Sequence, residues 1–271
     1  MDRLAIEFIS VLGLPPVAFV ELAASLGVGR IGLAPRPITA NPHGYPAWDL
    51  LADTALRRDL LAAMADTAVQ VSLGEGFLIR EGVDAAGFAP MLDLFADLGA
   101  PVVNAVNMVA SPEPFARFAE LAAARGMVAT VEFLPLMPPA TFAEALAFVD
   151  GSGADNARVL VDAMHFFRGG SAVAELAEAD LSRIGYVQIC DVPMPARTAD
   201  YGLEARENRL APGDGDLPLA DFLAAVPADV VVGLEVPQVS RAPEVGPAER
   251  LAPMIAAARG LMQQESTSSP A

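Results

Sequence analysis

The chain has 271 residues, 54% of them hydrophobic, so it is long enough and apolar enough to bury a sizeable core. Its formal net charge of −17 repels phosphate groups and argues against a nucleic-acid partner. All 17 basic residues are arginines, and the missing lysine excludes Schiff-base aldolases, pyridoxal-phosphate enzymes and P-loop NTPases.

The cysteine content and the length of the apolar stretches indicate in which cellular compartment the protein works. A single cysteine, Cys190, excludes a disulfide framework and fits a reducing cytoplasm. The longest uncharged apolar stretches, such as residues 8–20 with 13 residues, are too short to cross a bilayer. Glu7 and Glu21 flank residues 8–20, which disfavours a signal peptide. We therefore expect a cytoplasmic protein with no membrane partner.

Short β-branched runs alternate with alanine-rich amphipathic stretches along the chain. The runs predict strands at residues 6–11, 30–34, 69–73, 102–106, 128–133, 159–162, 184–189 and 230–236. The amphipathic stretches predict helices at residues 15–26, 55–67, 84–98, 114–125, 141–149, 172–179, 219–225 and 248–264.

Strict alternation of eight strands with eight helices predicts parallel pairing through right-handed crossovers. Eight such units in about 250 residues match a single α/β domain, a closed (β/α)8 TIM barrel over residues 1–264. Residues 265–271 are expected to form a flexible C-terminal tail. An open doubly wound sheet is the alternative, but no G-x-G-x-x-G motif follows any strand.

The predicted carboxyl ends of four strands carry an acid or an amide within an apolar run. They read Val131-Glu132-Phe133, Val161-Asp162-Ala163-Met164-His165, Val187-Gln188-Ile189-Cys190-Asp191 and Leu234-Glu235-Val236-Pro237. Burying several carboxylates together is costly unless a cation lies among them. Each acid alone is also compatible with capping the helix that follows its strand.

These local sequences resemble the xylose isomerase-like TIM barrel superfamily of sugar isomerases and epimerases, over essentially the whole chain. The likeness is strongest from Thr130 to Pro237. The D-x-x-H pattern stands as Asp162-Ala163-Met164-His165, and the Arg-x-x-Pro-Gly loop as Arg209-Leu210-Ala211-Pro212-Gly213. The Val-Gln-Ile strand around Gln188 is similar to hydroxypyruvate isomerase, whereas ketose 3-epimerases have histidine there.

The resemblance implies one divalent metal ion. Its ligands would be Glu132, Asp162, Gln188 and Glu235. Three carboxylates and an amide oxygen are hard donors, so we expect Mn²⁺ or Mg²⁺, with Co²⁺ or Zn²⁺ less favoured. Cys190 lies two residues after Gln188 and hence on the same face of the strand, which could bring it near the site, but a small buried core residue is the favoured interpretation.

The resemblance also implies a reaction. An isomerase or epimerase of this family transfers a proton through a metal-bound enediolate. Glu132 and Glu235 would serve as the acid and base, and His165 would donate a hydrogen bond to the developing oxyanion. A histidine that merely caps the strand end is the alternative for His165. A hydride shift is disfavoured, because it resembles a mechanism that uses a second metal and a lysine.

The substrate is expected to be a small molecule. Arg206 and Arg209 lie in the long polar segment 192–216 and are candidates to bind a hydroxyl, carboxylate or phosphate. Solvated surface charge is the alternative, more so for Arg206. The remaining candidates for substrate contact are His165, Arg168, Glu75 and Asn107, with Asn104 beside them.

Other functions remain open on the sequence alone. The same metal site would serve a dehydratase or lyase acting on a cyclic polyol or keto acid. A non-catalytic protein that binds a metal and a sugar is a third hypothesis. An abasic-site endonuclease is disfavoured, because only two histidines are present and the charge is strongly negative. The resemblance is compatible with a homo-oligomer.

Overall fold

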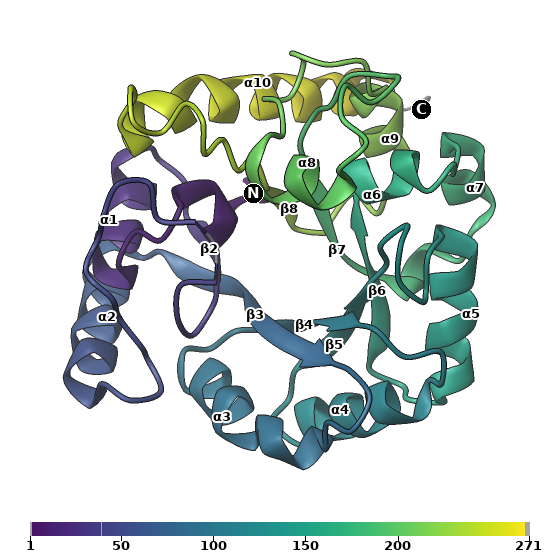
Figure 1. The fold of residues 1–271 in the computed structure, drawn as a ribbon, viewed down its shortest axis with the longest axis horizontal. Coiled ribbons are helices and arrows are strands. Elements are labelled where there is room, and N and C mark those ends of the chain that lie inside the picture. The colour runs from purple at the N-terminus through teal and green to yellow at the C-terminus, as the bar shows by residue number, and fades with distance from the viewer. Residues whose placement is uncertain (1, 39, 269–271) are drawn as a thin grey trace.

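In a computed structural model of the chain, which describes residues 2–38 and 40–268, eight parallel strands close into a barrel in the order of the sequence. Figure 1 shows the helices arranged around the outside of this ring of strands. The strands are β1 (Leu4–Ile6), β2 (Arg30–Leu33), β3 (Gln70–Ile79), β4 (Val102–Asn107), β5 (Val128–Glu132), β6 (Ala157–Asp162), β7 (Ile184–Ile189) and β8 (Val232–Leu234). The predicted (β/α)8 TIM barrel is confirmed.

The helices connect the strands and cover the outer face of the barrel. They are α1 (Pro16–Ser25), α2 (Thr54–Thr67), α3 (Ala89–Asp97), α4 (Glu113–Ala123), α5 (Phe142–Ser152), α6 (Ala163–Arg168), α7 (Val173–Glu178), α8 (Tyr201–Glu207), α9 (Leu219–Ala225) and α10 (Pro247–Ser268). Short 3-10 turns occur at Phe8–Val11, Ala85–Phe88 and Leu181–Arg183. In the described part of the chain, no helix is long and apolar enough to span a membrane.

The packing between helices and strands relies on large side chains meeting small ones. The rings of Phe77, Phe88, Phe95 and Phe118 lie 4.9–5.9 Å apart, measured between centroids. Gly74 of β3 has no side chain where the Phe95 ring of α3 lies, and a Cβ there would come within 2.6 Å of that ring. Such close packing holds each strand, and the polar residue at its end, in a fixed position.

The first strand is shorter than its apolar run predicts. It was expected over residues 6–11, but β1 ends at Ile6 and a 3-10 turn follows. Ser10 explains the difference, because its Oγ donates to the Leu234 carbonyl (2.9 Å) and accepts from the Val236 amide (2.7 Å). This side chain satisfies backbone groups that continued strand pairing would have used.

Three other expectations need correction. The third strand continues past Leu73 to Ile79, so Glu75 lies within β3 rather than at its end. The eighth strand covers only Val232–Leu234. The last helix was expected over residues 248–264, but α10 covers Pro247–Ser268. Residues 269–271 of the expected tail lie outside the described residues.

Candidate active site at the carboxyl end of the barrel

Six strands place a polar side chain at one end of the barrel, and all six side chains are buried. Because parallel strands share a direction, residues at their carboxyl ends converge on the mouth of the barrel. The converging residues, from β3 to the residue after β8, are Glu75, Asn104, Glu132, Asp162, Gln188 and Glu235, each 7% exposed or less. The four residues expected as metal ligands are among them.

A buried arginine lies among these carboxylates. The Arg209 Nη1 atom is 2.5 Å from Asp162 Oδ2 and 2.9 Å from Glu235 Oε2. Its Nε donates to the Ala205 carbonyl, and its backbone amide donates to the Pro237 carbonyl. The segment after β7 is therefore fastened across the barrel mouth, and this carries Arg209 inward to 3% exposure.

Gln188 connects two of the carboxylates. Its Nε2 donates to Glu75 Oε1 (3.2 Å) and to Glu235 Oε1 (3.1 Å). Its Oε1 is buried and has no hydrogen-bond partner in the described part of the chain. A buried amide oxygen without a partner is costly, so it is a candidate to bind a ligand.

His165 lies in the first turn of α6, a helix that was not expected from the sequence. Asp162 caps this helix, because its Oδ1 accepts from the His165 backbone amide (2.9 Å). The His165 Nε2 atom lies 3.3 Å from Glu132 Oε1, and Nδ1 lies 2.5 Å from the Tyr201 hydroxyl. The capping interaction and the ring contacts together fix the imidazole against Glu132.

Glu132 is also held from β4. Its Oε2 accepts from Asn104 Nδ2 (3.1 Å), and Asn104 Oδ1 accepts from the Thr130 hydroxyl (2.9 Å). This chain of hydrogen bonds sets the orientation of the carboxylate from behind. Asn104 therefore acts on the site by positioning Glu132.

Glu7, which follows β1, is a fifth carboxyl group in this region. Gly32 and Gly233 make room for it, because a Cβ at either position would overlap the Glu7 carboxyl group. Tyr186 donates a hydrogen bond to Glu7 Oε1 (2.8 Å), while Oε2 has no partner among the residues described. Burial raises the pKa of Glu7 to about 8, and the nearby charge of Glu132 adds to this.

The pKa shifts of the other carboxyl groups follow from burial and from Arg209. Burial raises the pKa of Glu75, and the charges of Glu132 and Glu7 raise it further. Burial also raises the pKa of Glu235, against the opposing effect of Arg209. Burial acts in the same direction on Asp162, but the charges of Arg209 and His165 outweigh it and lower the pKa.

The barrel mouth therefore carries an excess of acidic groups. Five buried carboxyl groups lie in this region, and they are Glu7, Glu75, Glu132, Asp162 and Glu235. Arg209 contacts two of them, Asp162 and Glu235. Within residues 2–38 and 40–268, however, no three His, Cys, Asp or Glu side chains are arranged so that they could hold a metal ion. The excess charge favours a cation, while Arg209 lies between two of the groups that would bind it.

The other expected substrate contacts mostly hold the loops together. Arg168 donates to both carboxylate oxygens of Glu204 (2.8 and 3.0 Å) and so connects α6 to α8. Asn107 Nδ2 donates to the Val109 and Pro138 carbonyls. Arg206 is exposed on α8, and no hydrogen bond or ion pair among the described residues connects it to the carboxylates.

Sequence reasoning missed Glu7, Tyr186 and Tyr201. Glu7 follows the apolar strand β1, as Glu235 follows β8, but the strand predicted over residues 6–11 placed Glu7 near the start of a strand rather than after its end. Tyr201 had no comparable signal, because it reaches His165 only through the folding of α8 over α6. Tyr186 lies on the inner face of β7, two residues before Gln188, and is fully buried.

Comparison with known proteins identifies relatives of this barrel. A family model described as a xylose isomerase-like TIM barrel matches residues 20–258. A protein named inosose isomerase from Halalkalibacterium halodurans is 28% identical over 153 residues, which are 51% of this chain and 52% of that protein. A putative hydroxypyruvate isomerase from Streptomyces coelicolor is 31% identical over 188 residues, or 59% and 62%. The matches thus span about half to three fifths of these relatives.

Solved structures share the fold over nearly the whole chain. The IOLI protein with a bound zinc atom superposes with a TM-score of 0.79 at 20% identity, covering 97% of this chain and 99% of that one. D-Psicose 3-epimerase from Clostridium cellulolyticum H10 has a TM-score of 0.72 at 14% identity, covering 96% and 99%. The family resemblance inferred from the sequence is confirmed.

Proposed function

Because the chain belongs to the xylose isomerase-like TIM barrel family, we propose that it is a sugar or hydroxy-carbonyl isomerase or epimerase that acts by proton transfer. Its curated relatives carry the names of isomerases, which supports an enzyme. The observation that carries the proposal is the pair of buried carboxylates, Glu132 and Glu235, held in one polar cluster with His165.

The proposed cofactor is one divalent cation, held by Glu132, Asp162, Gln188 and Glu235. This donor set fits Mn²⁺ or Mg²⁺, because all four residues offer hard oxygen atoms and the Gln188 oxygen is buried without a partner among the described residues. The zinc-bound structural neighbour keeps Zn²⁺ as an alternative, with Co²⁺. Binding by all four residues requires Arg209 to leave Asp162 or Glu235.

When bound, such a cation would polarise the substrate carbonyl and so acidify the neighbouring C–H bond. Glu132 and Glu235 come from strands on either side of β6 and β7, so a substrate between them would meet a carboxyl group on each side. One carboxylate removes the proton to give an enediolate, and a carboxylic acid returns a proton.

His165 is positioned to stabilise the enediolate. Burial raises the pKa of Tyr201, so its hydroxyl stays protonated and donates to His165 Nδ1. In the neutral imidazole, Nδ1 then acts as the acceptor, which places the proton on Nε2, the nitrogen that lies beside Glu132. A hydrogen bond from Nε2–H to a developing oxyanion is the expected contribution of this residue.

The exchange of a substrate proton for solvent deuterium tests the proposal. Hydroxypyruvate and a panel of ketoses would be incubated in heavy water with the Mn²⁺-loaded protein and followed by proton NMR. We expect exchange at the carbon beside the carbonyl, reduced about 10²-fold or more in Glu132→Gln and in Glu235→Gln. Asp59→Asn, an exposed substitution on α2, is the control.

The remaining outcomes would each contradict the proposal. Unchanged exchange in both glutamine variants would remove the proposed acid and base. Loss of water from the substrate would indicate a lyase instead. Binding of a metal and a sugar with no deuterium uptake by any substrate would indicate a binding protein.

A further inference from the structure

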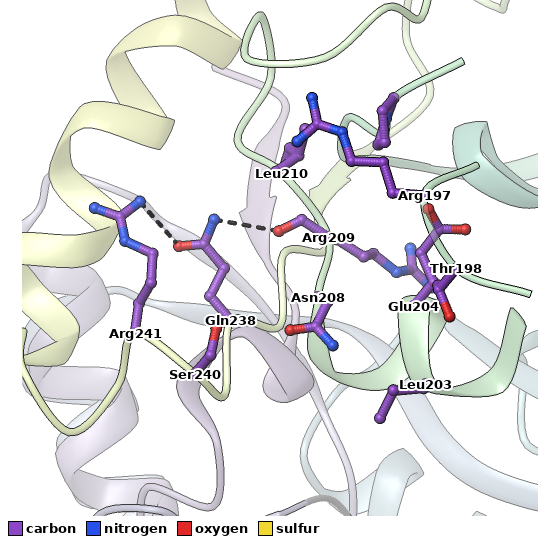
Figure 2. A pocket seen from close by; sticks show the side chains of 11 residues that line it. Arg197, Thr198, Leu203, Glu204, Asn208, Arg209, Leu210, Gln238, Ser240 and Arg241 are labelled. Carbon is purple, nitrogen blue, oxygen red and sulfur yellow. Dashed lines mark hydrogen bonds between the residues drawn. The ribbon is translucent and has the colours of Figure 1, made fainter. Parts of the chain in front are cut away.

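A cavity of about 340 Å³ lies beside the barrel mouth. It is formed between helix α8, the segment before it and the loop that follows β8, as Figure 2 shows. Arg209 contributes to its lining while the guanidinium of the same residue contacts Asp162 and Glu235. Arg209 is therefore shared between the lining of the cavity and the carboxylate cluster.

The lining of this cavity is positively charged, unlike the protein as a whole. It includes Arg197, Arg209 and Arg241 but only one carboxylate, Glu204. That carboxylate is already neutralised, because Arg168 donates to both of its oxygens. In a chain with a net charge of −17, three arginines around one cavity are a local concentration of positive charge.

Two of the three arginines have no carboxylate partner. Arg209 is paired within the carboxylate cluster, but Arg197 forms no hydrogen bond or ion pair with any residue described in the structure. Arg241 has a single long contact, 3.5 Å from its Nη1 to Gln238 Oε1 (Figure 2). Both guanidinium groups therefore keep their donors for a ligand.

The remaining polar lining also supplies hydrogen-bond donors. The hydroxyls of Thr198 and Ser240 and the amide of Asn208 line the same cavity. Planar guanidinium groups match the geometry of carboxylate and phosphate oxygens and form strong charge-assisted hydrogen bonds with them. Arg197 and Arg241 are exposed at the rim of the cavity, so water solvates both guanidinium groups until an anion replaces it.

We propose that this cavity is an anion-binding subsite in which Arg197 and Arg241 bind the phosphate or carboxylate of the substrate. The inference rests on the proposed function, because it assigns an acidic substrate to that reaction. The anionic group would lie in the cavity, and the reacting carbonyl would extend past Arg209 toward Glu132 and Glu235. The substrate class would be a phosphorylated sugar or a sugar acid.

Binding of inorganic phosphate tests the subsite without any catalytic step. Isothermal titration calorimetry with chelator-treated protein excludes phosphate held by a metal ion, and acetate as a second probe distinguishes a carboxylate site from a phosphate site. We expect each of Arg197→Gln and Arg241→Gln to weaken binding of the preferred anion about tenfold, and the double variant to weaken it further. Arg58→Gln, an exposed substitution on α2, is the charge-matched control and is expected to bind normally.

The link to the substrate needs a second measurement. Deuterium exchange would be compared between dihydroxyacetone phosphate and dihydroxyacetone if phosphate is the preferred anion, and between hydroxypyruvate and dihydroxyacetone if acetate is. We expect the double variant to lose about tenfold or more in kcat/KM for the charged ketone and to keep its rate with the neutral one.

Each outcome separates the subsite from the proposed function. Binding of neither anion, or binding that both arginine substitutions leave unchanged, overturns the subsite. An equal effect of the double variant on charged and neutral ketones overturns its role in substrate recognition. Anion binding that depends on both arginines, with no exchange of any ketone, supports the subsite and counts against proton transfer.

Discussion

Arg209 decides the charge balance at the barrel mouth, because its guanidinium contacts both Asp162 and Glu235. Its pKa is held well above its ordinary value, since the attraction of the two carboxylates outweighs the opposing effect of burial. In the metal-free protein, Arg209 supplies the positive charge that a bound cation would supply to these carboxylates. The two cations would therefore compete for the same carboxylates.

This competition gives a prediction for Arg209→Gln. Without chelatable metal, the variant leaves two buried carboxylates unpaired, and we expect a loss of about 3–5 kcal/mol in the free energy of unfolding. Added Mn²⁺ should raise the Tm of the variant more than that of the wild type, because it replaces the missing charge. Thermal unfolding with EDTA and with Mn²⁺ measures both effects.

Arg209→Lys is the matched control, since it keeps the positive charge, and it should lose less stability in EDTA. Equal Mn²⁺-induced shifts in the wild type and in Arg209→Gln would contradict the competition. So would the absence of any shift in both proteins.

Glu7 gives a prediction for the pH dependence of stability. Its pKa is raised from an ordinary 4.5 to about 8 in the folded protein, so the folded state holds the proton more tightly than the unfolded state. The stabilisation by the protonated group is complete below pH 4.5 and is lost as the pH rises to 8. The slope is at most about 1.4 kcal/mol per pH unit.

Glu7→Gln removes this titration and keeps the size of the side chain. We expect the variant to gain stability relative to the wild type as the pH rises from 5 to 8, as measured by urea unfolding in EDTA. Because all other groups titrate in both proteins, the difference between the two profiles isolates Glu7. Parallel profiles would show that Glu7 is ionised in the folded protein.

At the scale of elements, a buried ion pair connects α6 to α8. Arg168 and Glu204 are only 9% and 5% exposed and form a two-pronged contact. The same helix carries Tyr201, which fixes the ring of His165. The ion pair is therefore expected to determine how firmly α8 is held against α6.

Substituting Glu204 by Gln leaves the Arg168 charge buried without its partner. We expect a loss of about 3 kcal/mol in the free energy of unfolding, measured by chemical denaturation. We also expect faster trypsin cleavage after Arg197 and Arg206, which flank and lie on α8. Asp59→Asn removes an exposed ion pair instead and should change stability by less than about 0.5 kcal/mol. Cleavage as slow as in the wild type would contradict the role assigned to the ion pair.

The elements also show where prediction from sequence stops. Hydrophobic periodicity predicts where the eight strands and the long helices lie, because each buries one apolar face. It does not predict α6 and α8, which are held by side-chain contacts such as the Asp162 cap and the Arg168–Glu204 pair. It also extended the first strand past Ile6, since Phe8 and Val11 are as apolar in a 3-10 turn as in a strand.

At the scale of the whole molecule, the acids at the strand ends were the most informative signal in the sequence. A parallel barrel brings the carboxyl ends of its strands together, so the spacing of Glu132, Asp162, Gln188 and Glu235 was enough to predict that they meet. The position of Arg209 among them could not be predicted, because it depends on the path of the segment after β7. The arginine-lined cavity depends on the same path.

The distribution of acidic residues in the whole chain also favours a bound cation. The net charge is −17, and five of the acidic groups are buried at one end of the barrel. Ordinary surface acids remain in water, whereas these five raise the free energy of the metal-free folded state. A cation that binds them is therefore expected to stabilise the entire barrel as well as to serve the reaction.

The most direct test of this account is the number of Mn²⁺ ions bound per chain. The wild-type protein, Glu132→Gln and the exposed control Asp59→Asn would be freed of metal, incubated with Mn²⁺, separated from free ion and analysed for manganese, with circular dichroism to confirm folding. We predict about one equivalent in the wild type and in the control, and a loss of most of it in Glu132→Gln. A folded wild-type protein that retains no Mn²⁺, and no Mg²⁺, Co²⁺ or Zn²⁺ in parallel incubations with each ion, would contradict the cation site and the function built on it.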